Sequence, residues 1–272
     1  MKYATLRLQR ETCAAAWREG QFSRLPYADV GELLRCAPAL PTDFDGEVVA
    51  SDDDADFAPL IPAPGKILCM GLNYASHLRE LGRELPRQPT LFAKFANALI
   101  GARDRLQLPL HVSERLDWEA ELVVVVGRRL SRASVAEARE AIAGFTIGND
   151  VSARDLQLRS EQWLAGKTVD GTTPLGPMLV TPDEADPGKG LRVRCRVNGE
   201  CMQDGTTADL VWTPQALLAD ISSFCTLEPG DVVFTGTPGG IGAMRRPPIF
   251  LQSGDLLETE IEGLGVCRNH CR

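Results

Sequence analysis

The spacing of apolar and polar residues predicts a strand over residues 116–127, with β-branched residues in its second half and a glycine at its end. Successive side chains of a strand point to opposite faces, so Asp117, Glu119 and Glu121 would share one face. Residues 123–126 are apolar on both faces, and we expect that end to be buried. Neighbouring buried acids repel one another and are hard to ionise, and a bound cation would remove both difficulties. The alternative is that the acidic end emerges into solvent.

The rest of the chain alternates short strands with a few short helices. Further strands are predicted at residues 2–8, 66–70, 90–95, 144–149, 178–181, 191–197, 201–203, 231–235, 255–261 and 266–270. Helices are predicted at residues 27–35, 73–82, 134–143, 152–157 and 213–224. This pattern favours a mixed α+β, β-rich fold over regular βαβ units.

Turn and capping residues support several of these elements. Asn198-Gly199 predicts a tight hairpin. Asn73, Ser134, Ser152 and Thr213 stand where the N-caps of helices are expected.

The chain divides into two unequal parts. Prolines at 59, 62 and 64 predict an extended linker. We therefore expect a small N-terminal domain over residues 1–62 and a larger catalytic domain over residues 63–272.

Composition excludes some partners and compartments. The formal net charge of -8 and the lack of a Lys/Arg run argue against nucleic acid as a partner. The longest aliphatic run is too short to span a membrane. The N-terminus has no apolar run of signal-peptide length, and the eight cysteines are scattered without a Cys-x-x-Cys motif. We expect a cytoplasmic protein with reduced thiols.

Several separated motifs follow one another in a fixed order. They are Asn73-Tyr74-x-x-His77-x-x-Glu80, Asp117-x-Glu119-x-Glu121-Leu122, Asn149-Asp150-Val151-Ser152-Ala153-Arg154-Asp155, Gly166-Lys167-x-x-Asp170, Pro174-Leu175-Gly176-Pro177, Asn198-Gly199-Glu200, Gly230-Asp231 and Thr235-Gly236-Thr237-Pro238-Gly239-Gly240-Ile241-Gly242. Together they resemble the fumarylacetoacetate hydrolase family over roughly residues 64–270.

The resemblance implies a β-roll catalytic domain, usually dimeric, that binds one Mg²⁺ or Mn²⁺. By position, the metal ligands would be Glu119, Glu121 and Asp150. Oxygen ligands of this kind suit hard divalent cations. The resemblance also implies that Lys167 faces the substrate and that Arg154, Gln157 and Thr237 bind it nearby. It further implies a mobile lid that carries the catalytic residues His77 and Glu80.

Each of these residues also has a structural interpretation. Lys167 could be an ordinary surface lysine. Arg154 and Asp155 could form an ion pair on a helix surface, worth under ~1 kcal/mol. His77 and Glu80 lie three residues apart and could share a solvent-facing helix side.

The resemblance implies an enzyme acting on a small-molecule 2-oxo acid through an enolate. With His77 activating water, it would hydrolyse a C–C bond of an acylpyruvate-like or sugar-derived 2,4-diketo acid. The same site could decarboxylate an oxaloacetate-like acid or interconvert enol and keto forms, and fold does not choose among these reactions. A metal-dependent binding protein without turnover is the remaining alternative.

Overall fold

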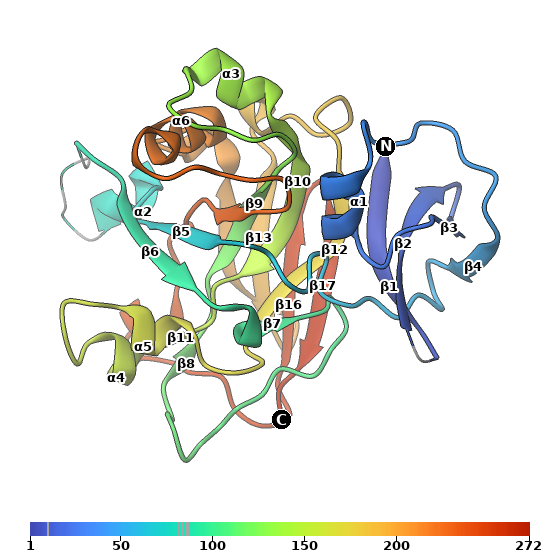
Figure 1. Cartoon of the computed structure of the whole chain (residues 1–272). Coiled ribbons are helices and arrows are strands. Elements are labelled where there is room, and N and C mark those ends of the chain that lie inside the picture. The colour runs from blue at the N-terminus through green and yellow to red at the C-terminus, as the bar shows by residue number, and fades with distance from the viewer. Residues whose placement is uncertain (10, 81, 83, 85–86) are drawn as a thin grey trace.

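The chain folds around one large sheet. The computed structural model describes residues 1–9, 11–80, 82, 84 and 87–272, apart from the side chains of His77 and Glu80. Within these residues the sheet has 11 strands (Figure 1). Ten of them run in the order β4 (Val48–Ser51), β3 (Gln21–Arg24), β2 (Glu11–Arg18), β1 (Lys2–Leu8), β12 (Thr173–Val180), β10 (Ile142–Asn149), β9 (Ala120–Val126), β15 (Val232–Phe234), β5 (Ile67–Gly71) and β6 (Thr90–Lys94). The remaining short strand, β7 (Leu99–Ile100), pairs in parallel with β12.

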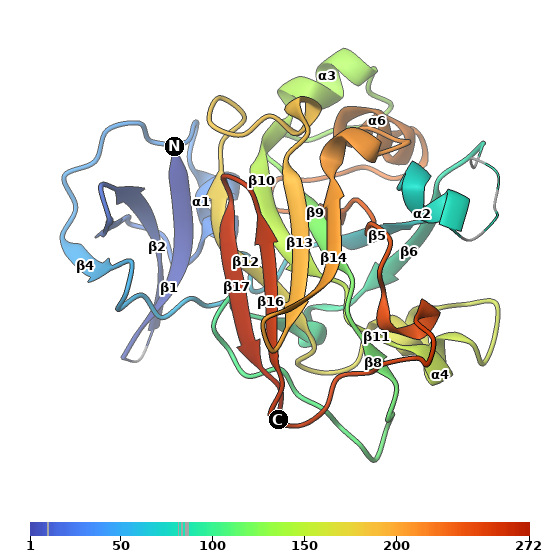
Figure 2. The ribbon, with the colours of Figure 1, turned by 180° about the vertical axis from the view of Figure 1, so that it is seen from behind.

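A second, antiparallel sheet lies across the middle of the large one, and Figure 2 shows it from the front. Its order is β14 (Glu200–Thr206), β13 (Arg192–Val197), β16 (Leu256–Ile261) and β17 (Gly265–His270). Asn198 and Gly199 join β13 to β14 with positive φ angles of 52° and 81°, which confirms the predicted hairpin. A separate small sheet pairs β8 (Leu116–Asp117) with β11 (Ser152–Ala153).

The helices are short and lie around these sheets. They are α1 (Val30–Cys36), α2 (Ala75–Glu80), α3 (Val135–Glu140), α4 (Arg154–Gln157), α5 (Leu164–Lys167) and α6 (Pro214–Phe224), with 3₁₀ turns η1 (Ala96–Ala98), η2 (Pro187–Lys189), η3 (Thr207–Asp209) and η4 (Gly242–Met244). Among the described residues, none of them has the length and apolar character needed to cross a bilayer. The mixed α+β, strand-rich fold predicted from the sequence is confirmed.

Two of the predicted helix caps are correct and two are not. Ser134 caps α3 in a capping box, and Thr213 caps α6. The Asn73 side chain instead bonds the backbone of Trp212 and Thr235. Ser152 belongs to β11, and its hydroxyl donates to the carbonyl of Asp150 (2.8 Å).

Strand β9 is buried on both faces, as its valine run predicts. Leu122, Val124 and Val126 pack into the core that includes residues of the second sheet. Val123 and Val125 pack into the other core, which includes α1. A central strand without an exposed face is a rigid support for the acidic residues at its start.

The N-terminal residues extend the large sheet. Strand β1 pairs antiparallel with β12, with Lys2 opposite Val180 and Tyr3 opposite Leu179. Arg7 also forms an ion pair with Asp104, with 2.6 Å between Nη2 and Oδ2. The boundary between residues 62 and 63 stays a prediction.

Candidate active site

The chain changes sheets in the middle of the strand predicted over residues 116–127. It forms β8 and β9, with Trp118 and Glu119 between them, so the expectation of one continuous strand is wrong at this point. β8 pairs with β11, while β9 pairs with β10, where Ala120 lies opposite Asn149. The break places Glu119 beside the end of β10, where Asp150 follows the last strand residue.

Three acids converge at this break. Glu119, Glu121 and Asp150 each offer a carboxylate oxygen, and these atoms lie within 4.8 Å of one another. All three side chains are buried, so the interpretation of a solvent-facing acidic edge is wrong. In an octahedral Mg²⁺ site with bonds of about 2.1 Å, ligand oxygens lie roughly 3–4 Å apart. The arrangement therefore fits a hard divalent cation.

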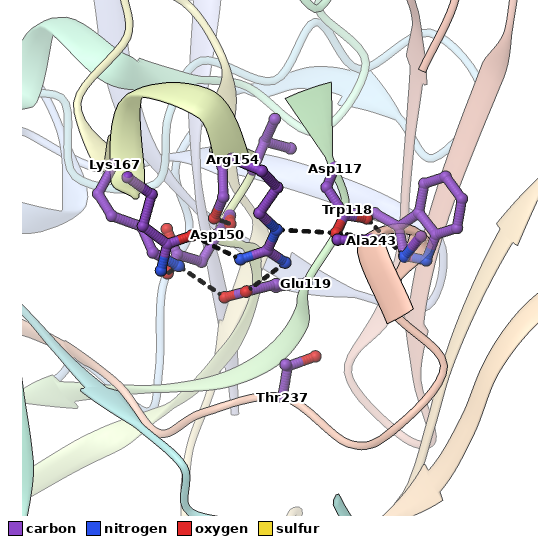
Figure 3. A network of polar contacts seen from close by, with 12 residues as sticks. Asp117, Trp118, Glu119, Asp150, Arg154, Lys167, Thr237 and Ala243 are labelled. Atoms are coloured by element: carbon purple, nitrogen blue, oxygen red, sulfur yellow. Dashed lines mark hydrogen bonds and ion pairs between the residues drawn. The ribbon is translucent and has the colours of Figure 1, made fainter. Parts of the chain in front are cut away.

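Two buried lysines neutralise part of this acidic group. Lys167, at the end of α5, donates to Glu119 Oε2 (2.8 Å) and Asp150 Oδ2 (2.7 Å), as Figure 3 shows. Its ammonium group also lies 4.8 Å from the ring centroid of Phe92. Lys167 is 1% exposed, which excludes the surface interpretation. Lys94, at the end of β6, donates to Asp150 Oδ1 (2.6 Å).

Sequence reasoning did not assign Lys94 a role. The sequence pattern that could have indicated a role is a lysine within an otherwise largely apolar strand, Thr90–Lys94. A lysine is rarely fully buried unless its charge is paired, so such a position points to an acidic partner elsewhere in the chain.

Burial and neighbouring charges shift the pKa values of the acids in opposite directions. Burial alone would raise the pKa of Asp150, but Lys167 and Lys94 outweigh it and lower that pKa to about 2. For Glu121, burial and then the charges of Asp150 and Glu119 raise the pKa well above its usual value. The negative charge on Glu121 is thus incompletely compensated by the protein, and a divalent cation between these acids would supply what is missing.

Arg154 binds two of the acidic side chains, Asp117 and Glu119, and also the side chain of Gln157. Its Nε donates to Asp117 Oδ2 (2.8 Å), its Nη2 lies 2.7 Å from Glu119 Oε1, and its Nη1 donates to Gln157 Oε1 (2.9 Å), the first two contacts being drawn in Figure 3. The predicted alternative, an ion pair with Asp155 on a helix surface, is wrong because Arg154 is buried and turns toward the acids.

Asp117 is buried and holds neighbouring groups in place. The sequence predicted that it shares a face with Glu119 and Glu121 but gave it no role. Besides Arg154, it accepts the backbone N–H groups of Gly242 (2.7 Å) and Ala243 (3.0 Å). Burial raises the pKa of Asp117 even though Arg154 opposes this shift. Its contacts join the acidic segment to η4 and fix the position of the Arg154 guanidinium.

Two buried amide side chains hold the backbone at the strand break. Gln203 Oε1 accepts from the N–H of Ala120 (2.9 Å), and its Nε2 donates to Thr237 Oγ1 (2.8 Å). The Thr237 hydroxyl in turn donates to the carbonyl of Ala120 (2.9 Å). Asn149 Oδ1 accepts from the N–H of Glu119 (2.8 Å). Gln203 lies outside the motifs that suggested the site. The sequence predicted the strand at residues 201–203 and the turn before it, but no role for this side chain.

A cavity of about 330 Å³ opens over this group. Six predicted site residues line it, namely Glu119, Glu121, Arg154, Gln157, Lys167 and Thr237. The backbones of His77 and Glu80 belong to α2, but their side chains lie outside the described residues, and their catalytic role stays a prediction.

Known proteins share both sequence and fold with this chain. The sequence is 45% identical to oxaloacetate tautomerase FAHD2A, mitochondrial, of Bos taurus over 218 residues, which cover 79% of this chain and 69% of that protein. A Xenopus laevis relative, oxaloacetate tautomerase fahd2, mitochondrial, is 40% identical over 89% of this chain and 76% of its own length.

Solved structures show the same architecture. A fumarylacetoacetate hydrolase from Exiguobacterium antarcticum matches with a TM-score of 0.91 and 31% identity, over 100% of this chain and 99% of that one. The 5-carboxymethyl-2-hydroxymuconate delta-isomerase of Mycobacterium smegmatis matches with a TM-score of 0.82 and 32% identity, over 100% and 98% of the two chains. The profile described as fumarylacetoacetate (FAA) hydrolase C-terminal matches residues 66–272. The resemblance seen in the motifs is confirmed, and the chain belongs to the fumarylacetoacetate hydrolase family.

Proposed function

We propose that the chain is a metal-dependent enzyme that interconverts the enol and keto forms of a 2-oxo acid. The observation that carries this proposal is a buried lysine, Lys167, that bridges two of the three clustered acids beside a cavity of small-molecule size. Bound Mg²⁺ or Mn²⁺, held by Glu119, Glu121 and Asp150, would act there as a Lewis acid toward the carbonyl group of the substrate.

The side chains around the cavity account for the rest of the reaction. Asp150 and Glu119 raise the pKa of Lys167 although burial lowers it, so its ammonium group stays charged and can donate to the enolate oxygen. Arg154 is oriented by Asp117 and can pair with a substrate carboxylate. Gln157 and Thr237 offer polar groups that orient the substrate. His77 is proposed as the group that exchanges the C3 proton, and Glu80 as the residue that would orient it.

The comparisons support enol–keto chemistry as the preferred reaction. Relatives 40–45% identical to this chain are named as oxaloacetate tautomerases. A protein with the same fold is named as an isomerase. In either direction of such a reaction one C–H bond and one O–H bond exchange a proton, and no co-reactant is needed.

Hydrolysis of a 2,4-diketo acid is the second candidate. The sequence favours it through His77 and Glu80, three residues apart on α2, which could activate water. Water would attack the distal carbonyl, the bond between C3 and C4 would break, and the products would be a 2-oxo acid and a carboxylic acid. Decarboxylation of an oxaloacetate-like acid would pass through the same enolate.

One substrate panel separates these reactions. Purified protein with Mg²⁺ or Mn²⁺ is given oxaloacetate and acetylpyruvate, and enol absorbance and pyruvate are followed. Faster enol–keto exchange without pyruvate supports the proposal, pyruvate from oxaloacetate indicates decarboxylation, and pyruvate from acetylpyruvate indicates hydrolysis. Oxalate binding without turnover of either compound would favour a non-catalytic binding protein. Lys167→Met should lose the activity, while Lys189→Met, at an exposed position, should keep it.

The setting of the enzyme is also proposed. All eight cysteines are free, which suits a reducing compartment such as the cytoplasm. The relatives above carry a mitochondrial designation in their names. A homodimer and the choice between Mg²⁺ and Mn²⁺ stay predictions, and sedimentation and metal analysis would test them.

A further inference from the structure

Apart from its charged and polar residues, the cavity is lined mainly by large apolar side chains. They are Met70, Leu72, Phe92, Leu158, Trp163, Ile241 and Met244. Phe92 and Trp163 stack edge to face, with ring centroids 5.4 Å apart and planes at 64°. A Cβ atom at Gly71 would come within 2.7 Å of the Trp163 ring, so the glycine makes room for that ring. The two stacked rings are therefore held in a defined position in the cavity wall.

The positively charged side chains of the described cavity lining are already paired with acidic side chains. Among the described residues that line the cavity, Lys167 and Arg154 carry positive charge. Lys167 lies within 2.8 Å of Glu119, and Arg154 lies 2.8 Å from Asp117. A second carboxylate at the far end of a substrate would meet apolar side chains, and burying an unpaired charge is costly. An apolar substituent would meet matching surface.

Two of the apolar residues that line the cavity are also exposed to solvent. Leu158, just after α4, is 78% exposed, and Met244, at the end of η4, is 45% exposed. Both residues line the cavity. A substrate substituent that covers part of these side chains would remove apolar area from water.

We propose that this apolar part of the cavity binds the side chain of the substrate, and that the enzyme acts on 2-oxo acids whose C3 carries an aromatic or other apolar group. The inference rests on the proposed function and adds the substrate class. In the reaction, the C3–H bond of the keto form breaks and the proton is gained at the carbonyl oxygen, with a C2–C3 double bond in the enol. No group is oxidised or reduced.

Phenylpyruvate and oxaloacetate are the two probes that test this inference. For the Mn²⁺-loaded protein, kcat/KM for enol–keto exchange and Kd by isothermal titration are measured with both. We expect phenylpyruvate to be preferred by about tenfold or more, since a single methylene in an apolar pocket changes selectivity roughly 10–200-fold. Equal or better use of oxaloacetate would overturn the inference.

A substitution in the wall provides the second test. Met244→Arg places a cation beside the apolar surface and should move the preference at least about tenfold toward oxaloacetate, while Met244→Leu should leave the ratio within about twofold. An unchanged ratio in Met244→Arg would contradict the subsite. If neither probe is turned over, the proposed function is wrong, and the ratio of the two Kd values decides the subsite alone: tighter phenylpyruvate supports it, and equal or weaker phenylpyruvate overturns it.

Discussion

Replacing Glu121 by glutamine separates its role in metal binding from its role in the fold. The side chain is 1% exposed, and its Oε2 accepts the N–H of Gly236 (2.7 Å). Burial and the neighbouring acids raise the pKa of Glu121, so its charged form is less favourable in the metal-free protein than it is in water. Glutamine has nearly the same shape, is neutral, and can still accept from Gly236. We expect the metal-free Glu121→Gln protein to differ from the wild type by less than about 1.5 kcal/mol.

The effect on metal-dependent stability should be large. A cation at 100 times its Kd stabilises the folded state by about 2.7 kcal/mol. At roughly 2–4 °C per kcal/mol for a domain of this size, the wild-type Tm should rise by about 5–10 °C. If losing one carboxylate ligand weakens binding about 100-fold, the same concentration stabilises Glu121→Gln by only about 0.4 kcal/mol. Its Tm should then rise by roughly 1–2 °C.

Thermal unfolding with and without Mn²⁺ measures both quantities. The control is Glu140→Gln, because Glu140 is an exposed residue at the end of α3. This control should show the full wild-type shift. A full Mn²⁺-dependent shift in Glu121→Gln would refute the assignment of Glu121 as a ligand. A strongly destabilised metal-free variant would instead refute the argument from its raised pKa.

Two further substitutions test the residues that hold the acids in place. Lys94→Met removes a buried partner of Asp150 and should lower the free energy of unfolding by about 3–5 kcal/mol, with part of the loss recovered in Mn²⁺. Chemical denaturation would measure this loss. A loss no larger than that of the exposed-site variant Lys189→Met would contradict the prediction. Gln203→Leu leaves the N–H of the strand break and the Thr237 hydroxyl without their amide partner and should weaken Mn²⁺ binding about 10–100-fold. Titration calorimetry would show whether the affinity instead stays at the wild-type value, which would mean that Gln203 does not position the ligands.

Local patterns predicted the elements whose causes are local. The valine run of β9, the capping box at Ser134 and the Asn198-Gly199 turn each follow from a few adjacent residues, and the structure confirms them. The motif order indicated the family because it combined many weak signals along the chain.

Elements that depend on distant partners were not visible in the same way. The break before β9 follows from the pairing of Asp117 with Ser152 in a separate sheet, which alternation alone does not show. Lys94 receives its role from Asp150, 56 residues further along the chain. Asn73 resembles a helix cap locally, yet its side chain satisfies backbone groups of the segment at Trp212. Tertiary hydrogen bonds override local preference at each of these positions.

The central claim is that Glu119, Glu121 and Asp150 together bind one divalent cation that a 2-oxo acid then shares. Crystals grown with Mn²⁺ and oxalate, an analogue of the enolate, test it through the anomalous scattering of manganese. The account predicts a single strong peak within coordination distance of one oxygen from each of the three carboxylates, with oxalate completing the shell. A peak elsewhere, or oxalate bound in the cavity with no metal among these three acids, would contradict it.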